Sequence, residues 1–227
     1  MKQFLPVLIY QKIGHAPKNS HLKKEWTPPG QLQNMISWLL GCGYTFITPA
    51  DLHQKRPVKP VLLAFIGGYQ SFYTDAFPLL QKHKVCATLF LAEDTLGTYN
   101  SWQNPHQEPW QTVVTAKQLK EMHKSGLVQI GTLGLDGHNL LEDEPTTARQ
   151  TLLESIYRFE KLYKISPCAV AFWPFPKTLS NRAQTIKKGI NLPVIPLRPG
   201  KNTLNEDQFL RILRPNFFTK LLLWKNK

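Results

Sequence analysis

The sequence has 227 residues, of which 42% are hydrophobic and 19% are charged. This length suits one substantial core and is short for two, so we expect a single domain that spans residues 1–227. The composition excludes a disordered chain, and no apolar run approaches the roughly 18 residues that cross a bilayer. The three cysteines, Cys42, Cys86 and Cys168, are widely spaced, which argues against a disulfide framework and a CxxC metal site.

The formal net charge of +13 is concentrated toward the end of the chain. Residues 177–227 contain eleven Lys or Arg and only two acids, Glu206 and Asp207. A positive field of this kind favours anionic partners such as nucleic acid, phospholipid or an acidic glycan, and charge alone does not choose among them. A solvated basic surface without a specific partner is an equally open interpretation.

The first apolar run, residues 4–10, is short for a signal peptide, and no small-residue cleavage site follows it. We therefore interpret it as a first strand. The expected location is the cytoplasm, or the periplasm or a membrane surface if an export signal was removed from a longer precursor.

The first part of the chain alternates short runs of branched and aromatic residues with helical patterns. Thr27 is a suitable N-cap for the first helix, Gly41 ends it, and Gly67 with Gly68 forms a turn after a buried strand. The predicted elements are a strand at Val7–Tyr10, a helix at residues 28–41, strands at 45–48 and 61–65, a helix at 71–83 and a strand at 86–91.

The second part continues this alternation after a segment rich in Gly, Asn and Pro at residues 95–113, which we predict to be a surface loop. Thr115 caps the next helix and Gly126 stops it. The predicted elements are a helix at residues 116–124, a strand at 127–130, a turn-rich segment at 131–140, a helix at 145–163, a strand at 168–172, a helix at 179–188 and a strand at 193–197.

About seven strands with five helices between them are typical of βα units and a largely parallel sheet. The sequence therefore predicts an α/β fold, a distorted (β/α) barrel of about seven parallel strands. In such barrels the functional groups lie at the C-terminal ends of the strands, because the loops there vary while the core holds them in place. The corresponding segments are residues 11–14, 66–70, 131–138 and 173–176.

Those segments contain four motifs in order. Residues 6–13 read PVLIYQKI, residues 64–69 read AFIGGY, residues 129–140 read QIGTLGLDGHNL and residues 172–176 read FWPFP. Together they resemble the polysaccharide deacetylase family, the NodB-homology fold of carbohydrate esterases, whose motifs commonly read PVLxYHxI, TFDDGY, EIGSHTxxHPxL and FAYPYG. Residues 209–212, FLRI, resemble the LPRI-like strand of exopolysaccharide deacetylases that act on poly-N-acetylglucosamine.

The resemblance implies a NodB-type barrel, but the residues that carry its chemistry are replaced. In the family the first aspartate of TFDDGY is the general base, and the second binds zinc or another divalent metal with both histidines of HTxxH. The base position here is Ile66, and the ligand positions are Gly67, Leu133 and Gly137. Alkyl and hydrogen side chains have no lone pair, so we expect the metal cofactor to be lost.

Two further departures concern the same chemistry. Gln11 stands where the family has a histidine beside the opening tyrosine, and no counterpart of the late LxH motif, which supplies the general acid, follows Gly189. The aromatic rings near the strand ends would still suit the CH faces of sugars, unless they belong to the barrel core. The residues of this candidate groove are Tyr10, Gln11, Gly68, Tyr69, Asp136, His138, Phe172, Trp173, Pro174 and Phe175.

These observations give three hypotheses about function. The first is a catalytically inactive deacetylase homologue that binds a glycan or a partner enzyme in cell-envelope polysaccharide metabolism. The second is an active hydrolase of an N-acetylated sugar with a site rebuilt around Asp136 and His138, which lie two residues apart. The third is an adaptor at a membrane or an anionic glycan that uses the basic C-terminal region, where apolar residues 217–224 form an interfacial anchor or a last strand or helix. No specific nucleic acid is expected, and the sequence leaves the oligomeric state open.

Overall fold

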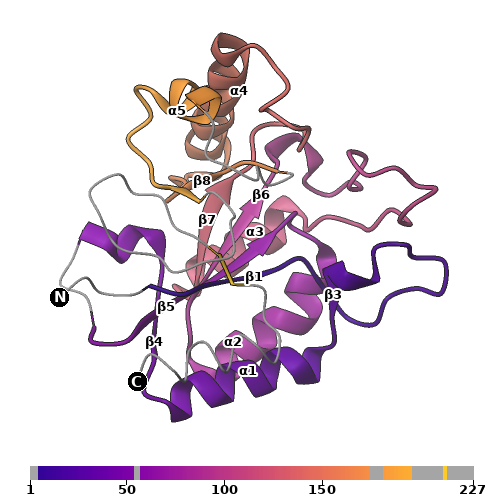
Figure 1. The fold of residues 1–227 in the computed structure, drawn as a ribbon, viewed down its shortest axis with the longest axis vertical. Helices are drawn as coiled ribbons and strands as arrows, with labels where there is room; N and C mark the ends of the chain where they lie inside the picture. Colours follow the sequence, from indigo (N-terminus) through magenta and orange to yellow (C-terminus); the bar gives the residue numbers. More distant parts are fainter. Residues whose placement is uncertain (1–4, 54–56, 174–180, 196–211, 214–227) are drawn as a thin grey trace.

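The computed structural model describes residues 5–53, 57–173, 181–195 and 212–213 (Figure 1). Eight strands among them form one sheet in which all pairings are parallel. The strands are β1 (Val7–Tyr10), β4 (Thr45–Ile47), β5 (Pro60–Ile66), β6 (Ala87–Leu91), β7 (Val128–Thr132), β8 (Val170–Ala171), β9 (Val194–Ile195) and β10 (Ile212–Leu213). Their order is β10-β1-β5-β6-β7-β8-β9, and β4 also pairs with β5.

Five α-helices connect these strands and cover the sheet (Figure 1). They are α1 (Pro29–Gly41), α2 (Phe77–His83), α3 (Ala116–Lys124), α4 (Pro145–Arg158) and α5 (Asn181–Lys187). The alternation of parallel strands and helices confirms the predicted α/β class and the distorted (β/α) barrel. Of the helices that the structure describes, none combines the length and the apolar character that a membrane span requires.

The local signals for helix ends are largely confirmed. Thr115 caps α3 in a capping box with Gln118, and Gly126 follows the helix with a φ of +75°. Thr27 was wrongly predicted as the cap of α1. Pro28 holds that position instead, because Thr27 belongs to a short strand, β3 (Trp26–Thr27).

Two predicted helices each contain a π-helical turn. Residues Phe72–Ala76 form one directly before α2, and residues Phe159–Tyr163 form another directly after α4. Turns of 3₁₀ helix lie at Lys23–Glu25, Pro49–His53 and Glu93–Thr95. The sequence pattern gave no signal for the small parallel sheet of β2 (Lys12–Ile13) with β3, which lies beside the C-terminal end of β1.

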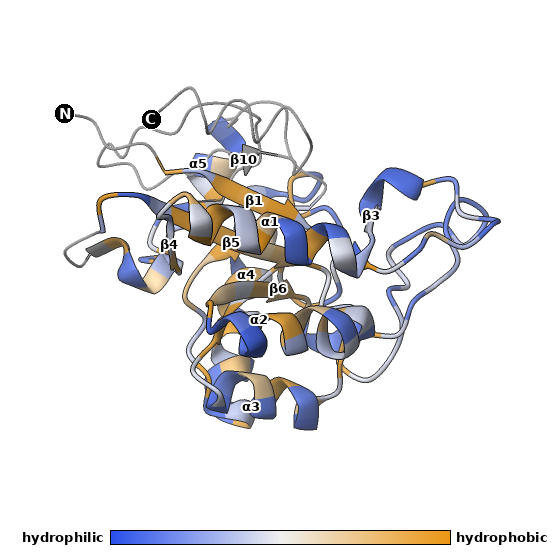
Figure 2. Ribbon diagram, turned by 90° about the horizontal axis from the view of Figure 1, so that it is seen from below, coloured by the Kyte–Doolittle hydropathy of each residue, from blue (hydrophilic) through white to orange (hydrophobic). Residues whose placement is uncertain are grey.

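The two faces of the central strands bury different side chains, as the two-residue period of a strand requires. Leu8, Tyr10, Leu63 and Phe65 pack in an outer core that also contains apolar residues of α1, α2 and α3. The alternate residues Val7, Ile9, Leu62, Ala64 and Ile66 pack in an inner core with residues of β6, β8 and the ends of the strands. Figure 2 shows the apolar strands β1 and β5 behind helices whose outer sides are hydrophilic.

Several predicted features lie outside the described residues. They are Pro174 and Phe175 of the candidate groove, the apolar residues 217–224, and all of the basic C-terminal quarter except residues 181–195 and 212–213.

Candidate functional site

The four positions that correspond to the family's base and metal ligands lie at the C-terminal ends of β5 and β7, on either side of β6. Ile66 is the last residue of β5, and Leu133 directly follows β7. Their side chains are only 2% and 3% exposed and belong to the same inner core. The structure therefore brings the base position and one ligand position together in an apolar environment.

An aromatic ring covers the ligand position at Gly67. A Cβ atom built on Gly67 would lie 2.5 Å from Cε2 of Tyr69, which is closer than real Cβ atoms approach other heavy atoms. Gly67 also has a φ of +101°, a backbone conformation that side chains with a Cβ rarely adopt. The Tyr69 ring, itself 3% exposed, thus packs against Gly67. It stands where the family motif TFDDGY also has a tyrosine.

A second ring covers the ligand position at Gly137 in the same way. A Cβ atom on Gly137 would lie 2.8 Å from Cε3 of Trp102, and the glycine has a φ of +81°. The centroids of the Trp102 and Tyr69 rings are 6.3 Å apart with an interplanar angle of 47°, within the range of aromatic contacts. We call this pair of rings the aromatic cover, because together they lie over both glycine positions.

The residues at these positions do not fit a divalent metal. Zinc needs nitrogen, oxygen or sulfur donors, and the side chains of Ile66, Gly67, Leu133 and Gly137 have none. Among residues 5–53, 57–173, 181–195 and 212–213, no group of three or more His, Cys, Asp or Glu side chains is arranged to hold a metal ion.

Asp136 and His138 do lie together, as expected from their spacing, but a third residue joins them. Nδ1 of His138 contacts Oδ1 of Asp136, and Nε2 of His138 lies 2.6 Å from Oδ2 of Asp143. Asp143 was not singled out in the sequence because it lies in a polar turn without a recognisable motif. Both ring nitrogens of His138 are therefore engaged by carboxylates, which leaves no lone pair directed at a metal.

The electrostatics of this histidine follow from its two partners. Burial alone lowers the pKa of His138, but hydrogen bonds with Asp143 and Asp136 outweigh it and raise the pKa above the ordinary value. For Asp136, burial acts to raise the pKa, and the hydrogen bond with His138 holds it below the ordinary value. The arrangement favours an imidazolium clamped between two carboxylates.

Two rings of the candidate groove, Tyr10 and Phe172, are buried in cores of the fold. Tyr10 is 2% exposed in the outer core, stacked on Phe65 with a centroid distance of 5.4 Å, and burial raises the pKa of its hydroxyl. Phe172 is 1% exposed in a third core, which it shares with apolar residues of α4 and α5. These two rings therefore supply core packing.

The remaining described groove residues are Gln11, Gly68 and Trp173. Trp173 is half-buried against that core, and Gln11 is half-buried at the end of β1. A Cβ atom on Gly68 would lie 2.8 Å from Cβ of Leu91, and its φ is +65°, so the turn requires glycine there.

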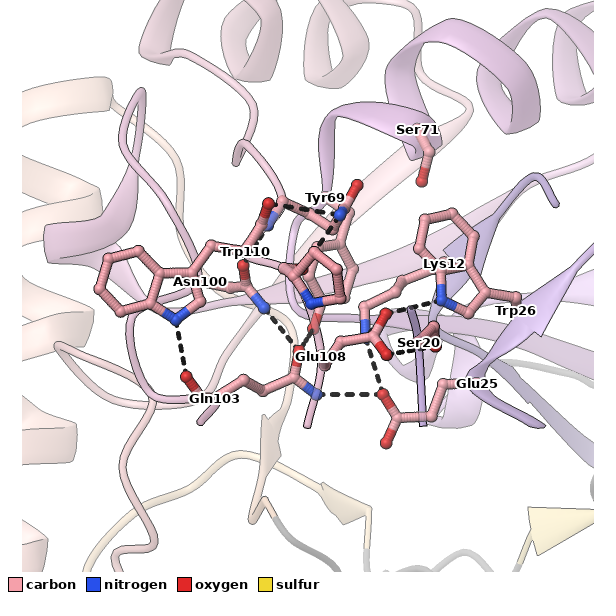
Figure 3. Close-up of polar contacts among 12 residues, drawn as sticks. Lys12, Ser20, Glu25, Trp26, Tyr69, Ser71, Asn100, Gln103, Glu108 and Trp110 are labelled. Atoms are coloured by element: carbon pink, nitrogen blue, oxygen red, sulfur yellow. Dashed lines mark hydrogen bonds and ion pairs between the residues drawn. The ribbon is translucent and has the colours of Figure 1, made fainter. Parts of the chain in front are cut away.

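Next to Gln11, the structure contains a buried ionic cluster that the sequence analysis missed. Lys12 is 0% exposed, and its Nζ lies 2.8 Å from Oε2 of Glu25 and 3.4 Å from Oε1 of Glu108, whose side chain is also 0% exposed (Figure 3). Trp26 donates a hydrogen bond of 2.7 Å from Nε1 to Oε1 of Glu108, and the Ser20 hydroxyl donates to Oε2. We call these five residues the Lys12 cluster.

The Lys12 cluster also contacts the aromatic cover. Nζ of Lys12 lies 5.1 Å from the centroid of the Tyr69 ring, within the range of a cation–π interaction. Burial alone raises the pKa of Glu108, but hydrogen bonds from Ser20 and Trp26 hold it below the ordinary value. The charge of Lys12 acts in the same direction. A lysine inside the apolar segment PVLIYQKI was the one available sign of this cluster.

The cluster joins two loops that are distant in sequence. Nε2 of Gln103 donates to Glu25 at 3.0 Å, and Nδ2 of Asn100 donates to Oε1 of Gln103 at 2.6 Å (Figure 3). The backbone N–H of His21 also donates to the carbonyl of Gln107 at 2.9 Å. Residues 12–27 and 98–113 are thus tied together at the end of the sheet where the family's chemistry takes place.

Comparison with known proteins identifies relatives of the chain. Residues 53–190 match the family model described as polysaccharide deacetylase. A poly-β-1,6-N-acetyl-D-glucosamine N-deacetylase of Staphylococcus aureus is 26% identical over 183 residues, which cover 75% of this chain and 60% of that protein. The chain therefore matches about 60% of the length of this curated relative.

Two solved structures have the same fold. A Streptococcus pyogenes deacetylase determined with acetate has a TM-score of 0.80 at 19% identity and covers 100% of both chains. The IcaB structure from Ammonifex degensii has a TM-score of 0.81 at 19% identity, over 99% of this chain and 98% of that chain.

Proposed function

The chain belongs to the polysaccharide deacetylase family, and from this membership we propose that it is a member without deacetylase activity, which binds a glycan or a partner enzyme in cell-envelope polysaccharide metabolism. The observation that carries the proposal is the absence of donor atoms at Ile66, Gly67, Leu133 and Gly137, which stand where the family has its general base and metal ligands. The Trp102 ring supports it, because this ring lies against Gly137.

The proposal follows from what amide hydrolysis requires. A metal supplies a Lewis acid for the carbonyl and lowers the pKa of the attacking water, and a general base contributes roughly two to four orders of magnitude in rate. Ile66 accepts no proton, and Gly67, Leu133 and Gly137 offer no donor atoms. With both functions missing from the inherited positions, the barrel keeps its fold and loses its chemistry.

The experiment combines turnover with metal analysis. The purified protein is incubated with β-1,6-linked N-acetylglucosamine oligomers and added zinc, cobalt or manganese, and released acetate is measured beside a catalytically active relative. We expect acetate at the level of the protein-free blank and less than one bound metal per chain. Metal-dependent acetate release together with one tightly held metal per chain would refute the proposal.

The same experiment tests the rebuilt site around Asp136 and His138. His138→Ala should leave the result unchanged, because its ring already bridges Asp136 and Asp143. Acetate release by the natural protein that His138→Ala abolishes would instead support the active hydrolase.

The adaptor hypothesis and the cellular location stay predictions. The basic region at residues 177–227 lies mostly outside the described residues. Co-sedimentation with anionic vesicles, lost at high salt, is the measurement that would support an adaptor at a membrane.

A further inference from the structure

The chain turns that lead into β5, β6, β7 and β8 lie at one edge of the sheet, because these neighbouring strands are parallel. This edge holds the N-terminal ends of the strands and is opposite the edge with the candidate site. Backbone hydrogen bonds keep the strand starts side by side, since the N–H of Ala87 donates to the carbonyl of Leu127 at 2.9 Å and the N–H of Cys168 donates to the carbonyl of Ile130 at 2.7 Å. Neighbouring strands lie about 4.8 Å apart, so side chains of adjacent turns are neighbours.

Five exposed lysines occupy the turns before β6, β7 and β8, and we call them the basic edge. They are Lys82 and Lys84 at the end of α2, Lys124 at the end of α3, and Lys161 and Lys164 at the end of the π-helical turn after α4. None of the five forms an ion pair with another residue that the structure describes. Their ammonium groups are therefore available to an anionic partner.

Few acids offset this charge. Glu121 and Glu160 are exposed in the last turns of the same helical segments. Asp51, whose charge reaches Cys86 at the start of β6, is half-buried, and its carboxylate accepts hydrogen bonds of 2.8 Å from the backbone N–H and the hydroxyl of Thr48. The basic edge thus keeps a net positive charge.

Two of the five lysines have an unusual backbone conformation. Lys84 has a φ of +53° and Lys164 a φ of +59°, and they are the non-glycine residues with a positive φ among those that the structure describes. Each is the C-cap residue of its helical segment, a position where glycine avoids the steric cost. Lysines in the last turn, Lys82 and Lys161, already complement the helix dipole. The charge at the two strained positions therefore indicates a role outside the helices themselves.

Aliphatic side chains are exposed at the same edge. Val58, in the turn before β5, is 89% exposed, and Leu162, two residues before Lys164, is 55% exposed. Nucleic-acid sites combine cations with hydrogen-bonding groups and stacking aromatic rings, which differ from these aliphatic groups. Lysines interspersed with exposed aliphatic side chains instead match the interface of an anionic bilayer, which offers phosphates to the former and the acyl boundary to the latter.

We propose that the basic edge binds the surface of an anionic lipid bilayer, with its lysines against the headgroup phosphates and Val58 and Leu162 in the interface. The inference goes beyond the proposed function, because it holds whether or not the chain releases acetate, and it uses no residue of the basic region at 177–227. In this orientation the candidate site and the loops at residues 12–27 and 98–113 face away from the bilayer, open to a ligand or partner.

The test measures co-sedimentation of the full chain with vesicles of phosphatidylserine and phosphatidylcholine, and with vesicles of phosphatidylcholine alone. The edge variant combines Lys84→Gln, Lys124→Gln and Lys164→Gln. We expect it to bind the anionic vesicles about a hundredfold more weakly, at about fivefold for each lysine near an anionic surface.

The matched control combines Lys18→Gln, Lys23→Gln and Lys24→Gln, which removes the same charge from exposed lysines at the opposite edge of the sheet. It should bind the anionic vesicles within about fivefold of the natural protein, because these lysines would lie farther from the bilayer than the screening length. Thermal melts should show that both variants are folded.

A second pair of substitutions tests the aliphatic contacts at unchanged charge. Val58→Gln together with Leu162→Gln should weaken binding to the anionic vesicles by about tenfold, because both side chains would leave apolar surroundings. Unchanged binding by this variant would refute the insertion of these two residues.

The outcomes separate the basic edge from other sources of binding. Equal losses in the edge variant and its control would overturn the proposal, because the net charge or the unchanged C-terminal region would then carry the binding. Equal binding to the neutral vesicles, or no binding of the natural protein to either kind, would also overturn it. So would tighter binding to a DNA duplex that the edge variant loses. Acetate release enters none of these outcomes, so the failure of the proposed function is distinguishable from the failure of this inference.

Discussion

Lys12 is the residue whose environment departs most from its ordinary one. A fully buried lysine is tolerated only when carboxylates and hydrogen bonds replace its hydration, and here Glu25 and Glu108 do so at 2.8 Å and 3.4 Å. The Tyr69 ring supplies a further contact for the ammonium group. The interaction therefore joins the loops at the end of the sheet to the Tyr69 ring, which packs against Gly67 at one of the positions that correspond to the family's metal ligands.

Removing the charge of Lys12 should destabilise the fold. Lys12→Met leaves the buried carboxylate of Glu108 without its cation, and breaking a buried pair in this way costs about 3–5 kcal/mol. We expect a loss of about 3 kcal/mol in the free energy of unfolding, measured by urea denaturation.

The matched control is Lys24→Met. Lys24 is exposed in the turn Lys23–Glu25, and a change there should stay within about 0.5 kcal/mol. Equal stability of Lys12→Met and the natural protein would mean that the Lys12 cluster does not form in solution.

At the scale of elements, the sequence predicted those strands and helix ends that are determined by neighbouring residues. The buried runs at β1 and β5 and the cap at Thr115 depend on neighbouring residues, and their positions were predicted closely. The pairing of β2 with β3 joins Lys12 to Trp26, and its register depends on the distant Glu108, so no local pattern specifies it. The hydrophobic periodicity also does not distinguish a π-helical turn from an α-helical one. This explains why residues 71–83 and 145–163 were each predicted as one continuous helix.

The loop that follows β7 should respond to pH through His138. The raised pKa of His138 means that its contribution to stability is complete below the ordinary value of 6.5 and is lost as pH rises through the folded-state pKa. The lowered pKa of Asp136 affects stability at acidic pH. Its contribution is present above the ordinary pKa of 3.8 and is lost as pH falls through the folded-state pKa. The interaction is therefore strongest between these two ordinary values.

The measurement is the free energy of unfolding at about pH 6 and about pH 9. Between these two pH values, the natural protein should lose more stability than His138→Gln does. The difference should be less than about 1 kcal/mol, because the His138 side chain is 40% exposed and solvent screens the interaction. His106→Gln, at an exposed histidine of another loop, is the control and should keep the natural pH dependence. If His138→Gln had the same pH dependence of stability as the natural protein, His138 would not be the group responsible for it.

For the molecule as a whole, the fold could be predicted from the sequence and the state of the site could be predicted only in part. The missing donor atoms at Ile66, Gly67, Leu133 and Gly137 are visible in the sequence. The contact of the Trp102 ring with Gly137 is not visible in the sequence, because Trp102 comes from a loop whose path depends on long-range contacts. Burial of Tyr10 and Phe172 was an open alternative, since aromatic residues suit a core and a sugar groove equally well.

Restoring the donors should therefore fail to restore the metal. In the fourfold variant Ile66→Asp, Gly67→Asp, Leu133→His and Gly137→His, two new side chains meet the aromatic cover and the other two replace buried apolar groups. We expect a lower melting temperature and less than one bound zinc per chain, and a gain in zinc only when Trp102→Ala is added. Full zinc occupancy with an unchanged melting temperature in the fourfold variant would contradict this account.

The two covered glycines also bear on how such a lineage can change. A ligand side chain introduced alone at residue 67 or 137 meets an unfavourable backbone angle, and at residue 137 it also meets the Trp102 ring. If the chain is inactive, as proposed, a first step toward hydrolysis at either glycine is thus penalised, while further substitutions there carry no catalytic loss. Selection on such a chain would leave its loops free to specialise.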